Sequence, residues 1–333
     1  MKKILATVLA MCMIFALCTS AAFADELPTY EFKFSISQGA TDPTATYAQQ
    51  MIDEIYEKTD GHVVMELHVG GELGSINEVN ELIASGAYML NYTGSDGFVG
   101  VVPELAILNS QYCLSDPDQM LKLMDSDWYK EQVETLAQNG DTRLLTLNWF
   151  TGFRHFATKF PVETLADFAG KNMRVADSAA AIAFAKALGM SPVVTSKNEV
   201  YTGMSNGMLD CFENPLNGIY SGSYFEVADY VVLTKHLVSC GGICMNETIF
   251  KSMPEEYQTA ILEAAYNAGL SYQEYSLGSE DAARANLEEA GMTVIEFTPE
   301  AMDEFRTAAS AMYEDPSLGF SKELYDNIQA AIK

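Results

Sequence analysis

The sequence is short of positive charge. Its 333 residues include 19 Lys and Arg against 46 Asp and Glu, which gives a formal net charge of −27 at pH 7. A chain this acidic repels nucleic acid and anionic lipid at long range, so we expect no nucleic-acid partner. An anionic ligand can therefore bind only where cations are placed locally to receive it.

The sequence also lacks the equipment of an enzyme. It has four histidines, and none stands at metal-ligand spacing from another histidine or from a carboxylate in a known motif. No Gly-x-Ser-x-Gly elbow and no phosphate-binding loop occur. We therefore expect no enzymatic activity, no cofactor and no metal.

Cysteines are few, and their spacing argues against disulfides. Cys240 and Cys244 lie on a predicted strand, where four residues span about 13 Å, too far for a disulfide. With Cys113 and Cys211 they make four cysteines beyond the N-terminal segment, and no cluster of metal ligands surrounds them. Buried free thiols are the favoured interpretation.

The longest apolar run stands at the N-terminus. Lys2 and Lys3 precede an apolar stretch over 4–17, and Ala22-Phe23-Ala24 follows it, an order typical of a secretory signal peptide. The apolar stretch is too short to span a membrane. We predict cleavage after Ala24 and an extracytoplasmic, periplasmic location. A lipoprotein acylated at Cys18 is the alternative, although Leu17 is a poor residue before such a cysteine.

Alternating strand and helix signals predict an α/β protein with two lobes. The predicted strands are 30–36, 62–69, 87–92, 143–150, 153–158, 171–176, 209–212 and 238–245. Predicted helices are 77–85, 179–188, 198–206, 299–313 and 321–332, and another begins near Asp42 and ends at Gly61. After a signal peptide over 1–24, we assign 25–150 plus 240–278 to lobe I and 151–239 plus 279–333 to lobe II.

One predicted helix is longer than a single lobe needs. Pro254 to Ala290 contains no internal proline, and its apolar residues keep helical spacing. A helix of that length measures about 55 Å, so it could run behind both lobes. The alternative is two helices broken near Gly278.

A series of short motifs in a fixed order resembles the solute-binding proteins of tripartite ATP-independent periplasmic (TRAP) transporters, the DctP-like family. The motifs are Gly152-Phe153-Arg154-His155, Lys159-Phe160-Pro161, Asp167-Phe168-Ala169-Gly170, Met173-Arg174-Val175, Leu188-Gly189-Met190, Glu199-Val200-Tyr201 and Glu213-Asn214-Pro215. The resemblance covers nearly the whole mature chain. It implies a two-lobed, periplasmic-binding-protein-like α/β fold with a long helix spanning both lobes and a ligand held in the cleft.

The resemblance also implies a carboxylate clamp. Arg174 matches the arginine that grips the ligand carboxylate, Asn214 the asparagine that assists, and Arg154 a second arginine. A guanidinium presents paired donors that fit a carboxylate, and Arg174 lies on a mostly apolar strand where its charge needs a partner. We expect Asn214 to donate from the opposite side of the cleft. The alternative partner for Arg174 is an internal Asp or Glu, and the alternative role of Arg154 is a structural ion pair.

Seven further residues complete the expected ligand contacts: Glu213, Phe212, Lys197, Asp177, Trp149, Ser37 and Thr93. Lys197 favours a ligand with a second polar or anionic group, unless it is a solvated surface lysine. In the sialic-acid-binding branch, the polar residues that contact the sugar align here with Ser37, Ile76, Gly94 and Gly97, so sialic acid is not expected.

The predicted function is capture of a small organic carboxylate in the inter-lobe cleft and its delivery to the membrane subunits of a TRAP transporter. We expect a monomer. Two alternatives remain open at this stage: a ligand-binding component of a signalling system, and a secreted enzyme on the same scaffold.

Overall fold

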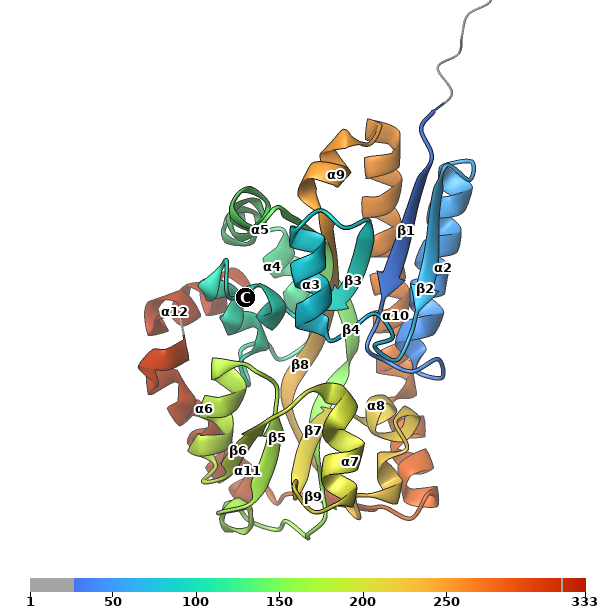
Figure 1. The fold of residues 1–333 in the computed structure, drawn as a ribbon. Coiled ribbons are helices and arrows are strands. Elements are labelled where there is room, and N and C mark those ends of the chain that lie inside the picture. The colour runs from blue at the N-terminus through green and yellow to red at the C-terminus, as the bar shows by residue number, and fades with distance from the viewer. Residues whose placement is uncertain (1–26, 319) are drawn as a thin grey trace, which may run out of the picture.

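The computed structural model describes residues 27–318 and 320–333. The expected signal peptide, its cleavage after Ala24 and the alternative at Cys18 lie outside the described residues. The described chain forms two lobes, one above the other, with the strands of each lobe between layers of helices (Figure 1). This is the predicted two-lobed α/β architecture.

The strands of the described residues join in one sheet of nine, in the order β2-β1-β3-β8-β4-β7-β5-β6, with β9 paired to β8. Three strands belong to the upper lobe: β1 (Tyr30–Ser35), β2 (Val63–His68) and β3 (Met89–Thr93). Four belong to the lower lobe: β5 (Asn172–Val175), β6 (Ser191–Val194), β7 (Cys211–Pro215) and β9 (Thr293–Glu296). The long strands β4 (Thr142–Thr158) and β8 (Tyr230–Asn246) run through both lobes and connect them.

Strand β4 corrects the prediction of two separate strands over 143–150 and 153–158. It is continuous, and it pairs with β8 antiparallel along its whole length. The pairing register shifts at four places between Leu144 and Phe156, which are β-bulges or irregularities. Gly152, near the middle of this stretch, has φ of 127°, a conformation open to glycine. Gly152 lies between the two predicted strands, and its conformation allows the continuous strand to bend without ending.

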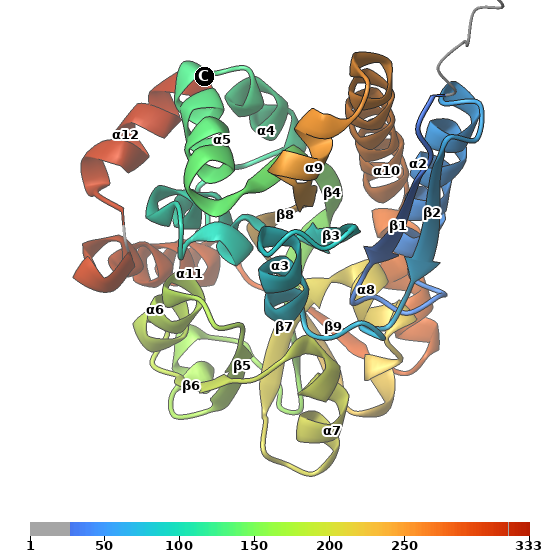
Figure 2. The ribbon, with the colours of Figure 1, turned by 45° about the horizontal axis from the view of Figure 1, so that its top comes forward.

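Helices cover both lobes (Figure 2). The upper lobe carries α2 (Pro43–Lys58), α3 (Ile76–Ala84), α4 (Pro117–Met124), α5 (Asp127–Gly140) and α9 (Glu247–Ser252). The lower lobe carries α6 (Ala179–Ala187), α7 (Val200–Ser205), α8 (Leu216–Ser221) and α11 (Pro299–Ser310). Helix α2 starts where the sequence indicated, because the Asp42 side chain accepts a hydrogen bond from the Thr44 N–H and Pro43 stands at the first helical position.

Helix α10 (Glu255–Glu289) is a single helix of 35 residues, and it is not broken at Gly278. Its first half packs into the core of the upper lobe through Tyr257, Ile261 and Tyr272. Near its end, Ala283 and Leu287 pack into a core of the lower lobe. The prediction of one helix that spans both lobes is confirmed.

The last helix packs into the upper lobe and not into the lobe that we predicted. We assigned 279–333 to lobe II, but α12 (Lys322–Ala331) packs Leu324 and Ile328 into the same core as Met120 and Leu123 of α4 in the upper lobe. The chain therefore returns to the upper lobe at its C-terminus, beside α4 and α5 (Figures 1 and 2).

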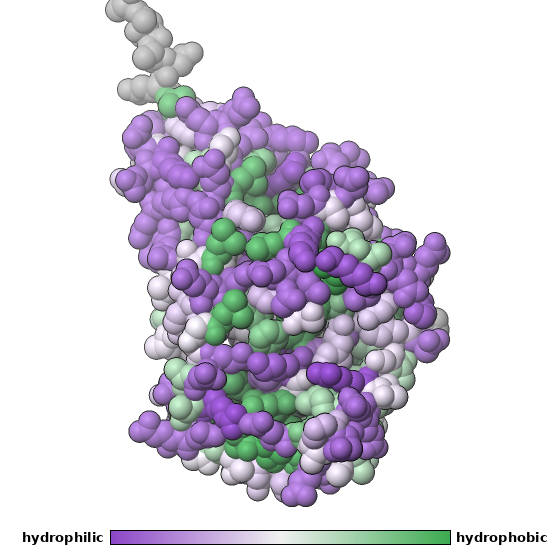
Figure 3. Space-filling model, turned by 180° about the vertical axis from the view of Figure 1, so that it is seen from behind, coloured by the Kyte–Doolittle hydropathy of each residue, from purple (hydrophilic) through white to green (hydrophobic). Residues whose placement is uncertain are grey.

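The four described cysteines are free, as expected, and Cys113, Cys211 and Cys244 are fully buried. No helix among the described residues is long and apolar enough to cross a membrane. Seen from behind, the surface is mainly hydrophilic, and apolar side chains are interrupted by polar ones (Figure 3).

Candidate functional site

A cavity of about 190 Å³ lies between the two lobes. The upper lobe contributes Ser37, Thr44 and Asp96 to its wall, and the lower lobe contributes Arg174 and Phe212. A second hollow of about 250 Å³ shares Ser37, Asp96, Arg174 and Lys197 with the first and is bordered by exposed residues such as Val194 and Asn198. The first hollow is thus the inner part of the cavity and the second is its mouth.

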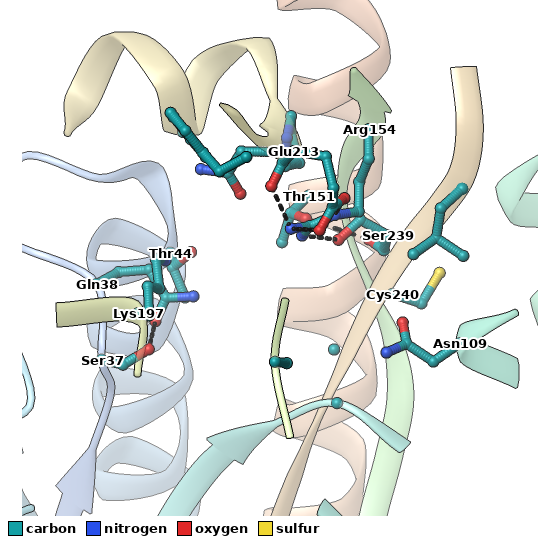
Figure 4. A pocket seen from close by; sticks show the side chains of 18 of the residues that line it. Ser37, Gln38, Thr44, Asn109, Thr151, Arg154, Lys197, Glu213, Ser239 and Cys240 are labelled. Carbon is teal, nitrogen blue, oxygen red and sulfur yellow. Dashed lines mark hydrogen bonds and ion pairs between the residues drawn. The ribbon is translucent and has the colours of Figure 1, made fainter. Parts of the chain in front are cut away.

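Arg154 and Glu213 form an ion pair on the lower-lobe wall, as Figure 4 shows. They lie on the neighbouring strands β4 and β7, and the Arg154 guanidinium donates to both carboxylate oxygens and to the Glu213 backbone carbonyl. His236 Nε2 lies 3.3 Å from the same carboxylate. Burial alone would raise the pKa of Glu213, but the charge of Arg154 outweighs it and holds that pKa far below the usual range. Arg154 is therefore already neutralised by the protein.

Arg174 is in a different position, because none of the described carboxylates forms an ion pair with it. It lies on β5, lines both parts of the cavity, and donates from Nε to the Thr195 backbone carbonyl at 3.0 Å. That bond leaves its two terminal nitrogens free of described partners. Burial lowers the pKa of Arg174, and this effect outweighs the opposing attraction to Glu213 and Asp96, while repulsion from Arg154 adds to it.

Lys197 adds a second cation near Arg174. It begins a short 3-10 turn (Lys197–Glu199), is partly buried and lines both parts of the cavity. Burial lowers its pKa to about 8, opposed by attraction to Asp42 and reinforced by repulsion from the two arginines. Lys197 is thus a cavity residue and not a solvated surface lysine.

Asn214 lies in the cavity wall, but not where we expected it. Its strand β7 pairs in parallel with β5, the strand of Arg174, with Met173 opposite Cys211. The two side chains therefore belong to the same sheet and the same wall, and the expectation that Asn214 faces Arg174 across the cleft is wrong. The upper lobe supplies the opposite wall, where Ser37, Gln38 and Thr44 lie together (Figure 4).

Phe212 and Ser37 also line the cavity. Phe212 is nearly buried and packs against Tyr224 with 4.5 Å between ring centroids, so it offers a fixed apolar surface. Ser37 donates to Gln38 at 3.2 Å on the opposite wall. Seven of the ten predicted contact residues are brought together in this way: Arg174, Asn214, Arg154, Glu213, Phe212, Lys197 and Ser37.

The other three predicted residues lie outside the inner part of the cavity. Trp149 is completely buried in the upper-lobe core, where its ring nitrogen donates to the Ala265 carbonyl at 2.8 Å, so its hydrogen-bonding capacity is used inside the protein. Thr93 is also fully buried, behind the cavity wall, and donates to the Gly94 carbonyl. Asp177 is exposed and borders only the mouth.

Asp42 joins the two lobes at the cavity, which the sequence did not indicate. Besides capping α2, its carboxylate accepts a hydrogen bond from Ser221 of α8 at 2.9 Å. Thr44 donates to the same carboxylate at 2.7 Å and contacts the hydroxyl of Tyr272 on α10 at 2.9 Å. Asp96, a partly buried acid, also lines the cavity, and burial raises its pKa.

The sequence analysis also missed two amides, Asn109 and Gln111, which line the inner part of the cavity. They lie at and just beyond the end of η2 (Pro103–Asn109), a 3-10 turn in a stretch where we predicted no element. No motif marks them, because their position depends on how the chain between the lobes is folded.

Among the described residues, no group of three or more His, Cys, Asp or Glu could hold a metal ion. Cys240 borders the cavity, but burial raises the pKa of its thiol to about 12, so it is a poor nucleophile at neutral pH. The arrangement is suited to holding an anion in a polar, partly enclosed space.

A family model agrees with this geometry. Residues 34–317 match the model of the bacterial extracellular solute-binding proteins of family 7, named DctP. Among curated proteins, the chain is 28% identical over 279 residues to the 2,3-diketo-L-gulonate-binding periplasmic protein YiaO of Escherichia coli, covering 83% of this chain and 84% of the relative.

Solved structures resemble the fold closely. A TRAP periplasmic solute-binding protein of Ochrobacterium anthropi with bound L-fuconate superimposes with a TM-score of 0.86 at 25% identity, covering 92% of this chain and 100% of the other. One from Actinobacillus succinogenes with bound L-galactonate gives a TM-score of 0.85 at 27% identity, covering 91% and 99%.

Proposed function

The chain belongs to the bacterial extracellular solute-binding proteins of family 7, and from that premise we propose what its cavity binds and how. As a member of this family it is a TRAP-type solute-binding protein that captures a small organic acid. We propose that the acid is a sugar acid, a carboxylate that carries several hydroxyl groups. The chemistry of the cavity supports this choice, because its wall combines charged residues, hydroxyls and amides with apolar side chains such as Ile76, Phe212 and Leu237.

One observation carries the proposal: Arg174 is a cavity-lining guanidinium with no carboxylate partner among the described residues. Arg154, by contrast, is paired with Glu213. A buried cation without a counter-ion is costly, and a ligand carboxylate would supply one through two parallel hydrogen bonds. The alternative weighed at first, an internal acid on Arg174, thus finds no support in the described ion pairs.

The remaining roles follow from position. Asn214 would donate to the same carboxylate from its place beside Arg174 on the same wall. Lys197, which lines both parts of the cavity, would contact a polar or anionic group close to the carboxylate, such as a 2-hydroxyl or 2-oxo oxygen. Phe212 would cover an apolar face of the carbon chain.

The relatives support a sugar acid as the ligand. The names of two similar structures report L-fuconate and L-galactonate, and the Escherichia coli relative is named for 2,3-diketo-L-gulonate. We further propose that the protein is exported with Asp25 as its first residue, acts as a monomer and hands its ligand to the membrane subunits of the transporter. N-terminal sequencing of exported protein tests the cleavage site.

A thermal-shift screen tests the function. Purified mature protein is heated with a panel of sugar acids, simple mono- and dicarboxylates, and neutral sugars of the same carbon skeletons. A ligand that binds only the folded state stabilises it by about 2.7 kcal/mol at a concentration 100 times its Kd. We expect sugar acids to raise the Tm and the matching neutral sugars to leave it unchanged. A panel in which no acid raises the Tm contradicts the proposal.

A further inference from the structure

The inner end of the cavity holds polar groups that the carboxylate clamp does not use. The Gln111 side chain is 4% exposed, and its amide oxygen is buried with no hydrogen-bond partner among the described residues. Asn109 is partly buried at the same end. Figure 4 shows Asn109 beside Cys240, across the cavity from Ser37 and Lys197. Neither amide borders the mouth, whereas Arg174 and Lys197 do.

The backbone around Gln111 is held in place by several hydrogen bonds, so a loose backbone does not explain why the side-chain oxygen is unpaired. The segment is tied to β8, because the Tyr112 N–H donates to the His236 carbonyl at 2.8 Å and the Tyr112 hydroxyl donates to the Thr234 carbonyl at 3.0 Å. The Tyr313 hydroxyl donates to the Gln111 carbonyl at 2.7 Å. The fold thus fixes this backbone from two directions, and Gln111 lies in the lining of the inner part of the cavity. A buried polar group left unpaired costs about 1–3 kcal/mol, so a ligand that pairs it gains that much.

We infer that Gln111, together with Asn109, recognises hydroxyl groups at the end of the ligand remote from its carboxylate. The inference rests on the proposed function, since it takes the carboxylate to lie at Arg174. A primary amide both donates and accepts hydrogen bonds, as a hydroxyl does, so the two groups are complementary. The ligand class is then a monocarboxylate whose far end is hydroxylated.

The charges in the cavity favour this class over a ligand with an anion at each end. Gln111 and Asn109 are neutral, and the lining near them includes Leu237, Ser239 and Cys240. Arg154 lines the same cavity and donates weakly to Ser239 at 3.4 Å, but its charge is neutralised by Glu213. A carboxylate or phosphate at the inner end would be desolvated without a free cation to pair it.

A matched pair of acids isolates the terminal hydroxyl. L-Fuconate is L-galactonate without its terminal hydroxyl, so the two probes share every other stereocentre. We expect calorimetry to show that the wild-type protein binds L-galactonate about tenfold more tightly than L-fuconate, the effect of one hydrogen bond. In Gln111→Leu the two affinities should agree within about twofold. Gln138→Leu, on α5 and away from the cavity, is the control and should keep the wild-type preference.

A second readout separates recognition from a structural role. Because the Gln111 amide lacks a described partner, Gln111→Leu should leave the Tm of the unliganded protein unchanged or raise it. A structural glutamine would instead lower it. If the leucine variant does not fold, Gln111→Ala is measured in the same way, since it only shortens the side chain.

The outcomes distinguish this inference from the function on which it rests. If the wild-type protein binds both acids equally, or if Gln111→Leu keeps the preference, recognition at the inner end is wrong while the sugar-acid function stands. If neither acid binds and no sugar acid raises the Tm, the proposed function is wrong and the inference with it.

Discussion

At the scale of single residues, Lys197 makes binding depend on pH. Its pKa in the free protein is lowered to about 8 by burial. A carboxylate placed beside it would raise that pKa again, so binding near pH 8 takes up a proton. Below pH 8, charged Lys197 makes its full contribution to the ligand affinity. This contribution is lost as the pH rises through the pKa that Lys197 has in the complex. The total loss of affinity is about tenfold for each unit by which binding raises that pKa.

Calorimetry with a bound sugar acid from pH 7 to pH 10 measures this effect. The wild-type affinity should fall over that range, and Lys197→Met should bind more weakly at pH 7 with a flat profile. Lys58→Met, which removes an exposed lysine paired with Glu54 and Glu263, is the control and should keep the wild-type slope. A wild-type affinity that does not change with pH means that Lys197 does not contact the ligand.

Glu213 neutralises Arg154, so its removal should destabilise the unliganded protein. Glu213→Gln keeps the side-chain shape but leaves Arg154 partly buried without a counter-charge, which we expect to cost about 3 kcal/mol in urea unfolding. Glu288→Gln, in the exposed pair with Arg284, should cost less than about 1 kcal/mol. Equal effects of the two substitutions would show that the Arg154–Glu213 pair contributes no more than a surface pair.

The site illustrates which residues a sequence reveals. Arg174, Arg154 and Asn214 stand in motifs with fixed spacing, so the sequence predicts them as ligand contacts. Trp149 is predicted as a ligand contact, yet its ring is buried in the upper-lobe core. Gln111 reaches the cavity only through contacts with β8 and Tyr313, which are distant in sequence and carry no local signal.

At the scale of elements, helix α10 connects the lobes, and its two glycines should respond in opposite ways to the same substitution. A Cβ on Gly269 would lie 2.1 Å from the Asn148 side chain on β4, whereas a Cβ on Gly278 would meet nothing within 4 Å. We expect Gly269→Ala to destabilise the protein by about 1–3 kcal/mol through overpacking. Gly278→Ala should stabilise it by up to about 1 kcal/mol, because alanine is the better helix former.

Urea unfolding of the two alanine variants checks this pair. If Gly269→Ala is as stable as the wild type, the helix is not packed closely against β4. If Gly278→Ala is destabilised, the helix is not continuous through that position.

The elements that the sequence predicted well are those with strong periodicity. Helix α10 and strands β1 and β2 match their predicted ranges to within a few residues, because each has an unbroken apolar pattern. Helices α4 and α5 were not assigned, although each begins at a side-chain cap, at Asp116 and Ser126. The first half of β8 was also missed, because its pairing with β4 and β9 depends on the tertiary fold.

At the scale of the whole molecule, two long strands and one long helix join the lobes, and β4 carries register shifts where it crosses between them. We predict that the lobes close on the ligand by bending at these connections. Small-angle scattering of mature protein should give a smaller radius of gyration with saturating ligand than without it. The Asp42–Ser221 hydrogen bond already links the lobes, so Ser221→Ala should lower the population of closed molecules without ligand. Identical scattering curves at saturation would argue against closure.

The measurement that tests the account most directly is calorimetry of a bound sugar acid with Arg174→Ala. Removing one partner of a buried charged pair costs about 2–5 kcal/mol, which is roughly a 30- to 4,000-fold loss of affinity. Arg174→Lys should also bind weakly, because an ammonium cannot form the two parallel hydrogen bonds. Arg284→Ala, which removes an exposed arginine paired with Glu288 and Glu296, should bind as the wild type does. An Arg174→Ala protein that is folded and binds within about threefold of wild type would contradict the carboxylate clamp.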